Sequence, residues 1–494
     1  MVINISKGTS GQTVNLQCPR FCKNLSLNTD YVNFVLEKTS INEYYLICGL
    51  KMFAFILGGQ KMFKLQENQT TVKTEIFAGM TTFFTMVYII VVNPAILSNT
   101  GIPFEQVFTA TIIATAIGTL WMALFANYPI AIAPGMGLNA YFAFSVVGSH
   151  GGIDYVTAFS AVFVAGIIFV ILSLTAFREK LIEAIPDNLK FGISAGIGLF
   201  IAFVGLKNTG IITSNPDNLV GLGNLHSPEV LLALFGLAVS LVLMALNVNG
   251  ALFFGMIITT IAAFVTGQLS FDKGIFSLPS LPDGVIVANP LEAFVDVFQH
   301  SLYAVVFSFL LVTIFDTTGT MIGVAEQAGF MRGKTLPNAK NALLSDSIAT
   351  TIGAMVGTSP TTAYIESTSG VAAGGKTGLT SLTVAVLFIL ASFLSPLVGA
   401  ISGVAAITAP ALIIVGSLMI GHVAKIKWNE IDEAFPAFLV ILTMPLTSSI
   451  STGIALGFIS LPLMKVAKGK WREVHPIVYI FAVLFFIQLA FLPH

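Results

Sequence analysis

The stretch PIAIAPGMGLNAYF, residues 129–142, interrupts a hydrophobic run with two prolines and two glycines. Because proline and glycine break a helix, a short extended piece should lead here into a half-helix. A second stretch, GTSPTTAYIESTSG at residues 357–370, has the same design. In each stretch a proline is followed five or six residues later by a polar side chain, Asn139 or Glu366. Freed backbone N–H groups and a half-helix N-terminus can hydrogen-bond a ligand at such a break.

Hydrophobic segments around these breaks form two series of seven. The first series is predicted near residues 77–97, 104–126, 128–147, 154–176, 191–206, 229–247 and 250–267. The second is predicted near residues 300–324, 341–357, 358–374, 378–398, 404–422, 435–448 and 451–467. The breaks are the third segment of each series, segments 3 and 10. An odd number of spans per half inverts the second half, and inverted-repeat carriers bind their ligand between paired broken segments.

Composition alone places the chain in a membrane. Of its 494 residues, 55% are hydrophobic and only 10% are charged, whereas about 25% are charged in an average soluble domain. The mean hydropathy is +0.89. A chain of this length cannot cover a water-facing surface with so few charges, so the lipid bilayer must be a partner. The formal net charge of -1 suggests no nucleic-acid partner.

The fold class is therefore an all-α polytopic membrane protein of about 14 transmembrane segments in two inverted 7-segment repeats. Residues 62–290 are expected to form the first repeat, and residues 291–494 the second repeat plus a C-terminal hydrophobic segment. That last segment, 476–491, either crosses the membrane or lies at its interface. Residues 1–61 are polar and mixed, and we expect them to be a non-native or disordered extension before a biological start at Met62.

Basic residues give the expected orientation. If the N-terminus with Lys64 and Lys73 is cytoplasmic and each span crosses once, four later basic loops also fall on the cytoplasmic side. These loops contain Arg178, Lys180 and Lys190; Arg332, Lys334 and Lys340; Lys425 and Lys427; and Lys465, Lys468, Lys470 and Arg472. The pattern predicts a multi-pass protein with a cytoplasmic N-terminus.

Two acids lie where lipid would normally exclude them. Asp316 sits deep inside a hydrophobic span, and Glu366 sits in the second broken segment. A charged carboxylate at mid-bilayer costs at least about 2.5 kcal/mol, so such a residue is protonated, paired or facing a watery cavity. Each of these states suits proton coupling, and neither span contains a basic partner. We therefore predict that Asp316 and Glu366 carry the coupled proton as a pair.

Other signals for chemistry are weak. The sequence GVAAGGKT at residues 370–377 matches the P-loop pattern, but it joins two membrane spans and lacks the strand that a P-loop follows. Lys376 is better interpreted as an anchor at the inner membrane face. Cys18 and Cys22 have no second ligand pair, so a zinc site is not expected. The sequence predicts no metal, no cofactor and no nucleophile–base set within the spans, and hence no enzyme.

Three runs resemble the AzgA-like purine permeases, a branch of the nucleobase–cation symporter-2 superfamily. They are NYPIAIAPGMGLNAY at residues 127–141, FDTTGTMIGVAEQ at residues 315–327 and TSPTTAYIES at residues 358–367. The likeness is strongest to the bacterial hypoxanthine/guanine permeases and extends from Met62 to about Leu492. Segment 10 reads Glu-Ser-x-x-Gly rather than the Gln/Glu-Asn-x-Gly of the nucleobase–ascorbate branch, which argues against xanthine, urate or uracil as main substrate.

The resemblance implies a core domain of segments 1–4 and 8–11, and a gate domain of segments 5–7 and 12–14. The gate is often the dimer contact in the family, so a homodimer is an expectation. The family holds its purine between segments 3 and 10 with acids of segments 8 and 10. Carried over by motif, those acids are Asp316 and Glu366, with Asn139 on segment 3. We expect backbone N–H groups near Gly137 to meet ring acceptors of the purine, and we count Ser367 with the substrate-binding residues. The resemblance also matches Asp432 to an acidic position before segment 13. Independently of the family, Tyr141, Phe315 and Tyr364 flank the polar positions, where an aromatic ring can stack on a flat base, and Thr317 is a further supporting position.

Together these observations predict a secondary transporter that imports hypoxanthine or guanine across the plasma membrane by proton symport and elevator-like alternating access. Adenine or another nucleobase stays open as the substrate, and sodium stays open as the coupling ion. An anion carrier of the same architecture would want basic charge at the site, and neither broken segment supplies any before Lys376. A channel would differ from a carrier in giving conductance and flux that does not saturate.

Overall fold

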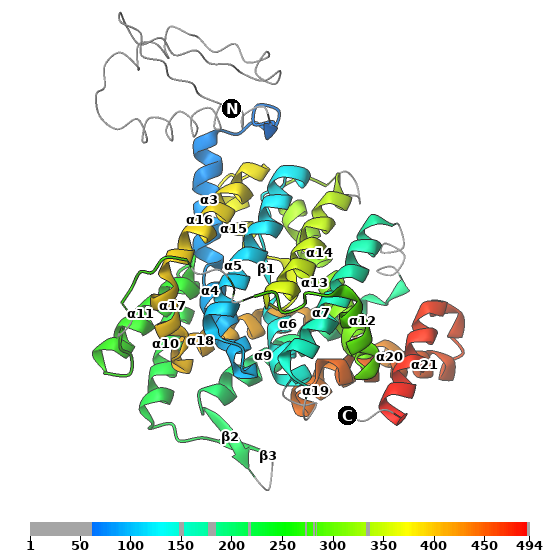
Figure 1. Ribbon diagram of the computed structural model, residues 1–494. Helices are drawn as coiled ribbons and strands as arrows, with labels where there is room; N and C mark the ends of the chain where they lie inside the picture. The colour runs from blue at the N-terminus through cyan, green and yellow to red at the C-terminus, as the bar shows by residue number, and fades with distance from the viewer. Residues whose placement is uncertain are drawn as a thin grey trace, which may run out of the picture. The chain divides into compact units, whose positions relative to one another are not determined.

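The computed structural model describes residues 62–147, 153–175, 184–215, 219–271, 274–279, 282, 284–331 and 336–491. The 1–61 extension lies outside the described residues, as do the loop residues Arg178, Lys180, Arg332 and Lys334. The described chain is a bundle of helices with two short two-stranded sheets (Figure 1).

Every predicted segment of the first series is present. The elements are α3 (Val72–Met86) and α4 (Ile89–Leu97); α5 (Phe104–Trp121) with the π-helical turn η3 (Met122–Ala126); β1 (Ile132–Pro134), α6 (Met136–Ala140) and η4 (Tyr141–Val147); α7 (Tyr155–Leu174); α9 (Asp187–Asn208); α10 (Pro228–Ala245); and α11 (Ala251–Val265). Polar caps start several of them, because a side-chain oxygen can accept from an unpaired N–H of the first turn. Thr71 caps α3, Asp154 caps α7 and Ser227 caps α10.

The second series repeats this order. Its elements are α13 (Tyr303–Gln327); α14 (Ala339–Val356); β4 (Thr361–Ala363) and α15 (Ser367–Ala372); α16 (Gly378–Ala391) with η5 (Ser392–Leu394) and α17 (Ser395–Ser402); α18 (Ala405–Ile420) with η6 (Gly421–Lys425); α19 (Ile431–Thr447); and α20 (Ile450–Ala467). After the short η7 (Trp471–Glu473), the last helix is α21 (Pro476–Phe491). Both broken segments thus have a strand followed by a short helix, as the sequence predicts.

Length and hydropathy agree with a membrane setting. Within the described ranges, nine helical stretches are long and apolar enough to cross a membrane. Shorter apolar helices at Met136–Val147 and Ala251–Val265 belong to segments 3 and 7. Large apolar side chains such as Val265, Leu246 and Leu463 are strongly exposed, as expected for surfaces that face lipid rather than water.

The helices separate into two packed groups. In the core domain, α3 packs on α16, and α14 packs on both α5 and α7 (Figure 1). In the gate domain, α9 packs on α18 and α19, and α10 packs on α11 and α18. Glycine allows the closest approaches: a Cβ at Gly79 would lie 2.6 Å from the Thr383 side chain, and one at Gly416 would lie 2.4 Å from the Gly198 carbonyl oxygen. Close helix packing through small residues is the usual solution inside a bilayer.

Two structural features were not predicted. The hairpin of β2 (Ile212–Asn215) and β3 (Leu219–Leu222) lies between segments 5 and 6, and α12 (Pro290–Gln299) precedes segment 8. α12 begins with a cap typical of helices, since Asn289 accepts from the Leu291 N–H and proline occupies the first turn. The sequence pattern does not predict α12, because ten residues are too few to be recognised as a span.

The C-terminal segment is the helix α21, which packs on α20. Its rings Phe481 and Phe485 contact Phe307 of α13 and Phe458 of α20, with centroids 4.1 to 6.0 Å apart. α21 is therefore attached to both domains by aromatic contacts, and whether it crosses the bilayer stays a prediction.

Candidate functional site

The two broken segments meet as a two-stranded antiparallel sheet. β1 pairs with β4 in the register Ile132 to Ala363, Ala133 to Thr362 and Pro134 to Thr361. Main-chain bonds extend the ladder at both ends: the Gly135 N–H donates to the Pro360 carbonyl at 2.9 Å, and the Tyr364 N–H donates to the Ala131 carbonyl at 3.0 Å. Backbone groups freed by the helix breaks thus satisfy one another across the two repeats.

Glu366 stands at the start of α15, directly after this ladder, and is half-buried. Its Oε1 accepts a hydrogen bond of 2.6 Å from the Tyr88 hydroxyl, which lies between α3 and α4. The sequence prediction of Glu366 did not include Tyr88. An aromatic residue in an apolar span carries no sequence signal that separates a site residue from ordinary packing.

Asp316 lies halfway along α13 and is exposed, although its neighbours on the opposite face of the helix are buried. A Cβ at Gly319, one turn further on, would meet nothing within 4 Å. Asp316 lies close enough to Thr362 of β4 and to Glu366 for both to influence its electrostatics. The structure therefore brings the two predicted acids together beside β4.

A third acid, Asp346 of α14, was missed in the sequence. It is fully buried, and its Oδ1 accepts 2.7 Å from the Thr361 hydroxyl while Oδ2 accepts from the Thr317 hydroxyl. Thr317 follows Asp316, and Thr361 belongs to β4. Asp346 thus connects the acid-bearing helix to the ladder, and the rule that identified Asp316, an acid inside a hydrophobic span, applies to it equally.

Asn139 lies in a buried polar network behind the ladder. Its Nδ2 donates 3.1 Å to Asn93 Oδ1, and Asn93 Nδ2 donates 2.8 Å to the hydroxyls of both Thr111 and Thr358. This network joins segments 1, 2, 3 and 10. The Asn139 backbone N–H already donates to the Gly135 carbonyl, so it is not free for a ligand. Its Oδ1 is buried and unpaired among the described atoms, so this oxygen is the part of Asn139 with spare hydrogen-bonding capacity.

The other predicted residues have separate positions. Gly137 faces the gate helix α9, where a Cβ would lie 2.4 Å from Ile197. Ser367 is buried, and its hydroxyl accepts 3.1 Å from the Ala131 N–H. The Tyr364 hydroxyl donates 2.6 Å to the Pro134 carbonyl, which crosses the ladder a further time. Ser367 and Tyr364 therefore hold segments 3 and 10 together.

Two aromatic candidates belong to the apolar core. The Tyr141 ring is fully buried with its centroid 4.8 Å from that of Phe309. Phe315 is partly buried and packs against the same core. Phe315 directly precedes Asp316, and Tyr141 follows two residues after Asn139. The described contacts of both rings are packing contacts.

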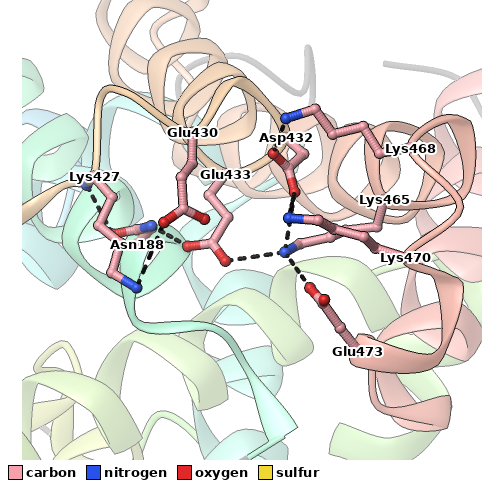
Figure 2. A network of polar contacts seen from close by, with 9 residues as sticks. All are labelled: Asn188, Lys427, Glu430, Asp432, Glu433, Lys465, Lys468, Lys470 and Glu473. Carbon is pink, nitrogen blue, oxygen red and sulfur yellow. Dashed lines mark hydrogen bonds and ion pairs between the residues drawn. The ribbon is translucent and has the colours of Figure 1, made fainter.

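Asp432 lies in an ion-pair cluster rather than beside the ladder (Figure 2). Its buried carboxylate contacts the ammonium groups of Lys468, Lys465 and Lys470 at 2.6, 3.2 and 3.4 Å. Lys465, itself buried, also contacts Glu433 at 3.0 Å and Glu473 at 2.9 Å. The lysines balance the charge of Asp432 without a substrate, and the cluster joins the ends of α19 and α20 in the gate domain.

The P-loop-like sequence forms a turn that binds a carboxylate of the same chain, that of Glu75. Glu75, in the first turn of α3, is fully buried. Its carboxylate accepts from the N–H groups of Lys376 and Thr377, at 3.0 and 3.2 Å, and from the hydroxyls of Thr377 and Thr380, at 2.9 and 2.7 Å. These donors surround the start of α16, where a helix favours negative charge. Glu75 occupies the place where a nucleotide phosphate would lie in a true P-loop.

Glu75→Gln is expected to lower the free energy of unfolding by about 2–4 kcal/mol, because its amide group would face donors that now bind a carboxylate. Thermal unfolding of the purified protein in detergent measures the loss. Glu67→Gln is the matched control, since Glu67 is exposed and its ion pair within the described residues is with exposed Lys64. Equal unfolding temperatures for the two variants would contradict a stabilising role of Glu75.

No metal-binding group of three or more His, Cys, Asp or Glu side chains occurs among the described residues. The polar groups that do converge are the carboxylates of Asp316, Glu366 and Asp346, and hydroxyls of threonine and tyrosine. Such a set can accept hydrogen bonds from a neutral polar ring and can exchange protons, and it does not offer positive charge to an anion.

Comparison with known proteins identifies the family. Residues 73–456 match the Permease family, Xan_ur_permease. The chain is 70% identical over 432 residues to the guanine/hypoxanthine permease PbuO of Bacillus subtilis (strain 168), covering 87% of this chain and 100% of that protein. It is 44% identical to the adenine permease AdeP of Escherichia coli (strain K12), covering 88% of this chain and 96% of that protein.

The fold also matches a solved structure. The transmembrane domain of the cyanobacterial bicarbonate transporter BicA aligns with a TM-score of 0.55 at 18% identity, covering 77% of this chain and 96% of that chain. BicA has the fold of two inverted repeats of seven segments. The predicted fold class, with its core and gate domains and paired broken segments, is thereby confirmed.

Proposed function

The chain belongs to the Permease family, Xan_ur_permease, and is a multi-pass membrane transporter rather than an enzyme; from that premise we propose that it imports guanine or hypoxanthine by proton symport. The observation that carries the proposal is that Asp316 of α13 and Glu366, at the start of α15, lie beside the β1–β4 ladder, close enough for their charges to interact. The proposed setting is the plasma membrane with a cytoplasmic N-terminus, and the gate domain is the proposed contact of a homodimer.

In the proposed mechanism, Glu366 accepts hydrogen bonds from purine ring N–H groups. Backbone N–H groups in the first turn of α6, near Gly137, meet ring acceptors, and Asn139 supports that turn through Asn93. Asp316 and Glu366 share the coupled proton, because two interacting acids titrate as a pair. The core domain then moves against the gate domain in an elevator-like step that exposes the site on the other side. The contact of Gly137 with Ile197 lies on this sliding surface.

Adenine is the alternative substrate, since the chain is also 44% identical to an adenine permease. The bases differ at one ring edge, where an oxopurine has an N1–H donor and adenine has an N1 acceptor. The anion-carrier alternative rests on fold alone. Two carboxylates with no cation beside them in the described part of the chain disfavour an anion at this place.

Uptake of radiolabelled hypoxanthine into cells that lack their own purine carriers tests the proposal. Unlabelled guanine and hypoxanthine are expected to compete strongly, adenine less, and bicarbonate not at all. Collapsing the pH gradient with an uncoupler should abolish accumulation while leaving counterflow in proteoliposomes intact. Accumulation that is indifferent to the uncoupler but requires sodium would overturn proton coupling, and absence of saturable uptake would overturn the nucleobase assignment.

A further inference from the structure

Segment 1 is interrupted in the middle, between α3 and α4, and Tyr88 lies at the interruption. The Tyr88 ring is only 1% exposed, so its hydroxyl needs an internal partner. That partner is Glu366 Oε1, at 2.6 Å. The proposed transport mechanism assigns no role to this hydrogen bond between Tyr88 in segment 1 and Glu366 in segment 10.

The distance between Tyr88 and Glu366 is set by tight packing of α15 on α3. A Cβ at Gly370 of α15 would lie 2.0 Å from Thr82 Oγ1 and 2.8 Å from the Ala78 carbonyl oxygen, so the two helices nearly touch there. The Thr85 hydroxyl also reaches the Glu366 carbonyl, at 3.4 Å. The hydroxyl of Tyr88 therefore meets a carboxylate whose helix cannot easily move away.

This contact decides what the carboxylate offers to a ligand. Oε1 already accepts from Tyr88, and in the described part of the chain Oε2 accepts from no other side chain. We propose that Tyr88 is a positioning residue for substrate selectivity: it fixes Glu366 so that Oε2 presents an acceptor to a ring N–H of the bound base. Tyr88 itself does not touch the substrate.

The inference rests on the proposed function and goes beyond it by naming the source of the preference among bases. An acceptor held in place suits the N1–H edge of hypoxanthine or guanine. Adenine presents an acceptor at N1, so it leaves the fixed Oε2 facing another acceptor. Sites built to bind a hydrogen-bonding group discriminate strongly against analogues that lack it. A carboxyl group without its Tyr88 bond can rotate and adapt to either edge, so discrimination falls.

Tyr88→Phe keeps the buried ring and removes only the hydroxyl. In uptake assays the variant is expected to raise the KM for hypoxanthine about tenfold, equivalent to about 1.4 kcal/mol, with Vmax within about twofold of wild type. The inhibition constant of adenine should fall relative to that of hypoxanthine. Both constants are independent of how much carrier reaches the membrane, so a loss of protein alone does not produce this result. Glu366→Asp, which withdraws the carboxylate from Tyr88, should shift the adenine preference in the same direction.

Tyr128→Phe is the matched control, because Tyr128 is another buried tyrosine whose hydroxyl donates to a carbonyl, that of Pro337. It should leave the ratio of the adenine and hypoxanthine constants unchanged. An unchanged ratio in Tyr88→Phe, or the same change in Tyr128→Phe, overturns the role of Tyr88. Wild-type protein that takes up no purine at all would instead refute the proposed function, so the two failures are distinguishable.

Discussion

Glu366→Gln is expected to reduce uptake of hypoxanthine and guanine about a hundredfold while the protein still folds and reaches the membrane. Glutamine has nearly the same size, and its amide oxygen can still accept from Tyr88. The remaining amide nitrogen is a donor, however, and it would face a donor N–H of the purine. A mismatch of this kind in a desolvated site costs about 2–3 kcal/mol, which corresponds to the hundredfold loss. Initial rates of radiolabelled uptake, normalised to carrier in the membrane, measure it.

Asp316→Asn provides the comparison that separates binding from coupling. Asparagine keeps the size of Asp316 and one of its acceptor oxygens, while removing the titrating group whose charge interacts with that of Glu366. This variant should bind purine and support counterflow, yet fail to accumulate substrate from a pH gradient. Wild-type accumulation in Asp316→Asn would remove Asp316 from coupling, and wild-type uptake in Glu366→Gln would place the substrate elsewhere.

Lys465→Met is expected to give the largest loss of stability. The Lys465 ammonium is 4% exposed and contacts three carboxylates, those of Asp432, Glu433 and Glu473. Methionine fills a similar volume but leaves buried negative charge without its central partner, which typically costs about 3–5 kcal/mol. The unfolding temperature of the purified protein should fall by on the order of 5 °C. Lys427→Met is the control, since its pair with Glu430 is exposed and longer, at 3.9 Å. Equal unfolding temperatures would show that the cluster adds no stability.

The stability contributed by this cluster depends on pH through Glu473, its exposed carboxylate. The hydrogen bond from Lys465 lowers the pKa of Glu473 below its usual value. A carboxyl group with a lowered folded-state pKa stabilises the fold above its unfolded pKa, and this contribution disappears as the pH falls through the folded value. Acidification should therefore lower the free energy of unfolding that the Lys465 cluster contributes. An ion pair made by a histidine would show the opposite dependence, because its stabilising effect is present at low pH and is lost as the pH rises.

Most of the fold could be predicted because hydrophobic length is a strong signal in membrane proteins. All fourteen segments have helices or strands where the pattern placed them, and α14 and α20 agree to within about two residues. The pairing of β1 with β4 could not be predicted. The prolines of the two broken segments predict two extended pieces, but no local sequence signal indicates that Ala133 pairs with Thr362. The hairpin of β2 and β3 and the helix α12 were missed because none of them is long or apolar enough to be recognised as a span.

Of the residues at the candidate site, only the charged ones had a clear signal in the sequence. Asp316 and Glu366 stand out against apolar surroundings, and Asp346 would have been found by the same reasoning. Tyr88 and Asn93 were different, because a tyrosine and an Asn-Pro pair in a hydrophobic helix look like packing and a helix stop. Their partners are 278 and 265 residues away, in Glu366 and Thr358, so only the folded chain reveals them.

The ladder between β1 and β4 has a consequence for how such carriers diverge. Its hydrogen bonds run from backbone to backbone, and they connect the broken segments of the two repeats beside the candidate site. Backbone hydrogen bonds of this kind depend little on which side chains the paired strands carry. Each repeat can therefore accumulate substitutions that change which base is recognised while the joint between the repeats survives, so new substrate preferences can arise by drift in one half without redesign of the other.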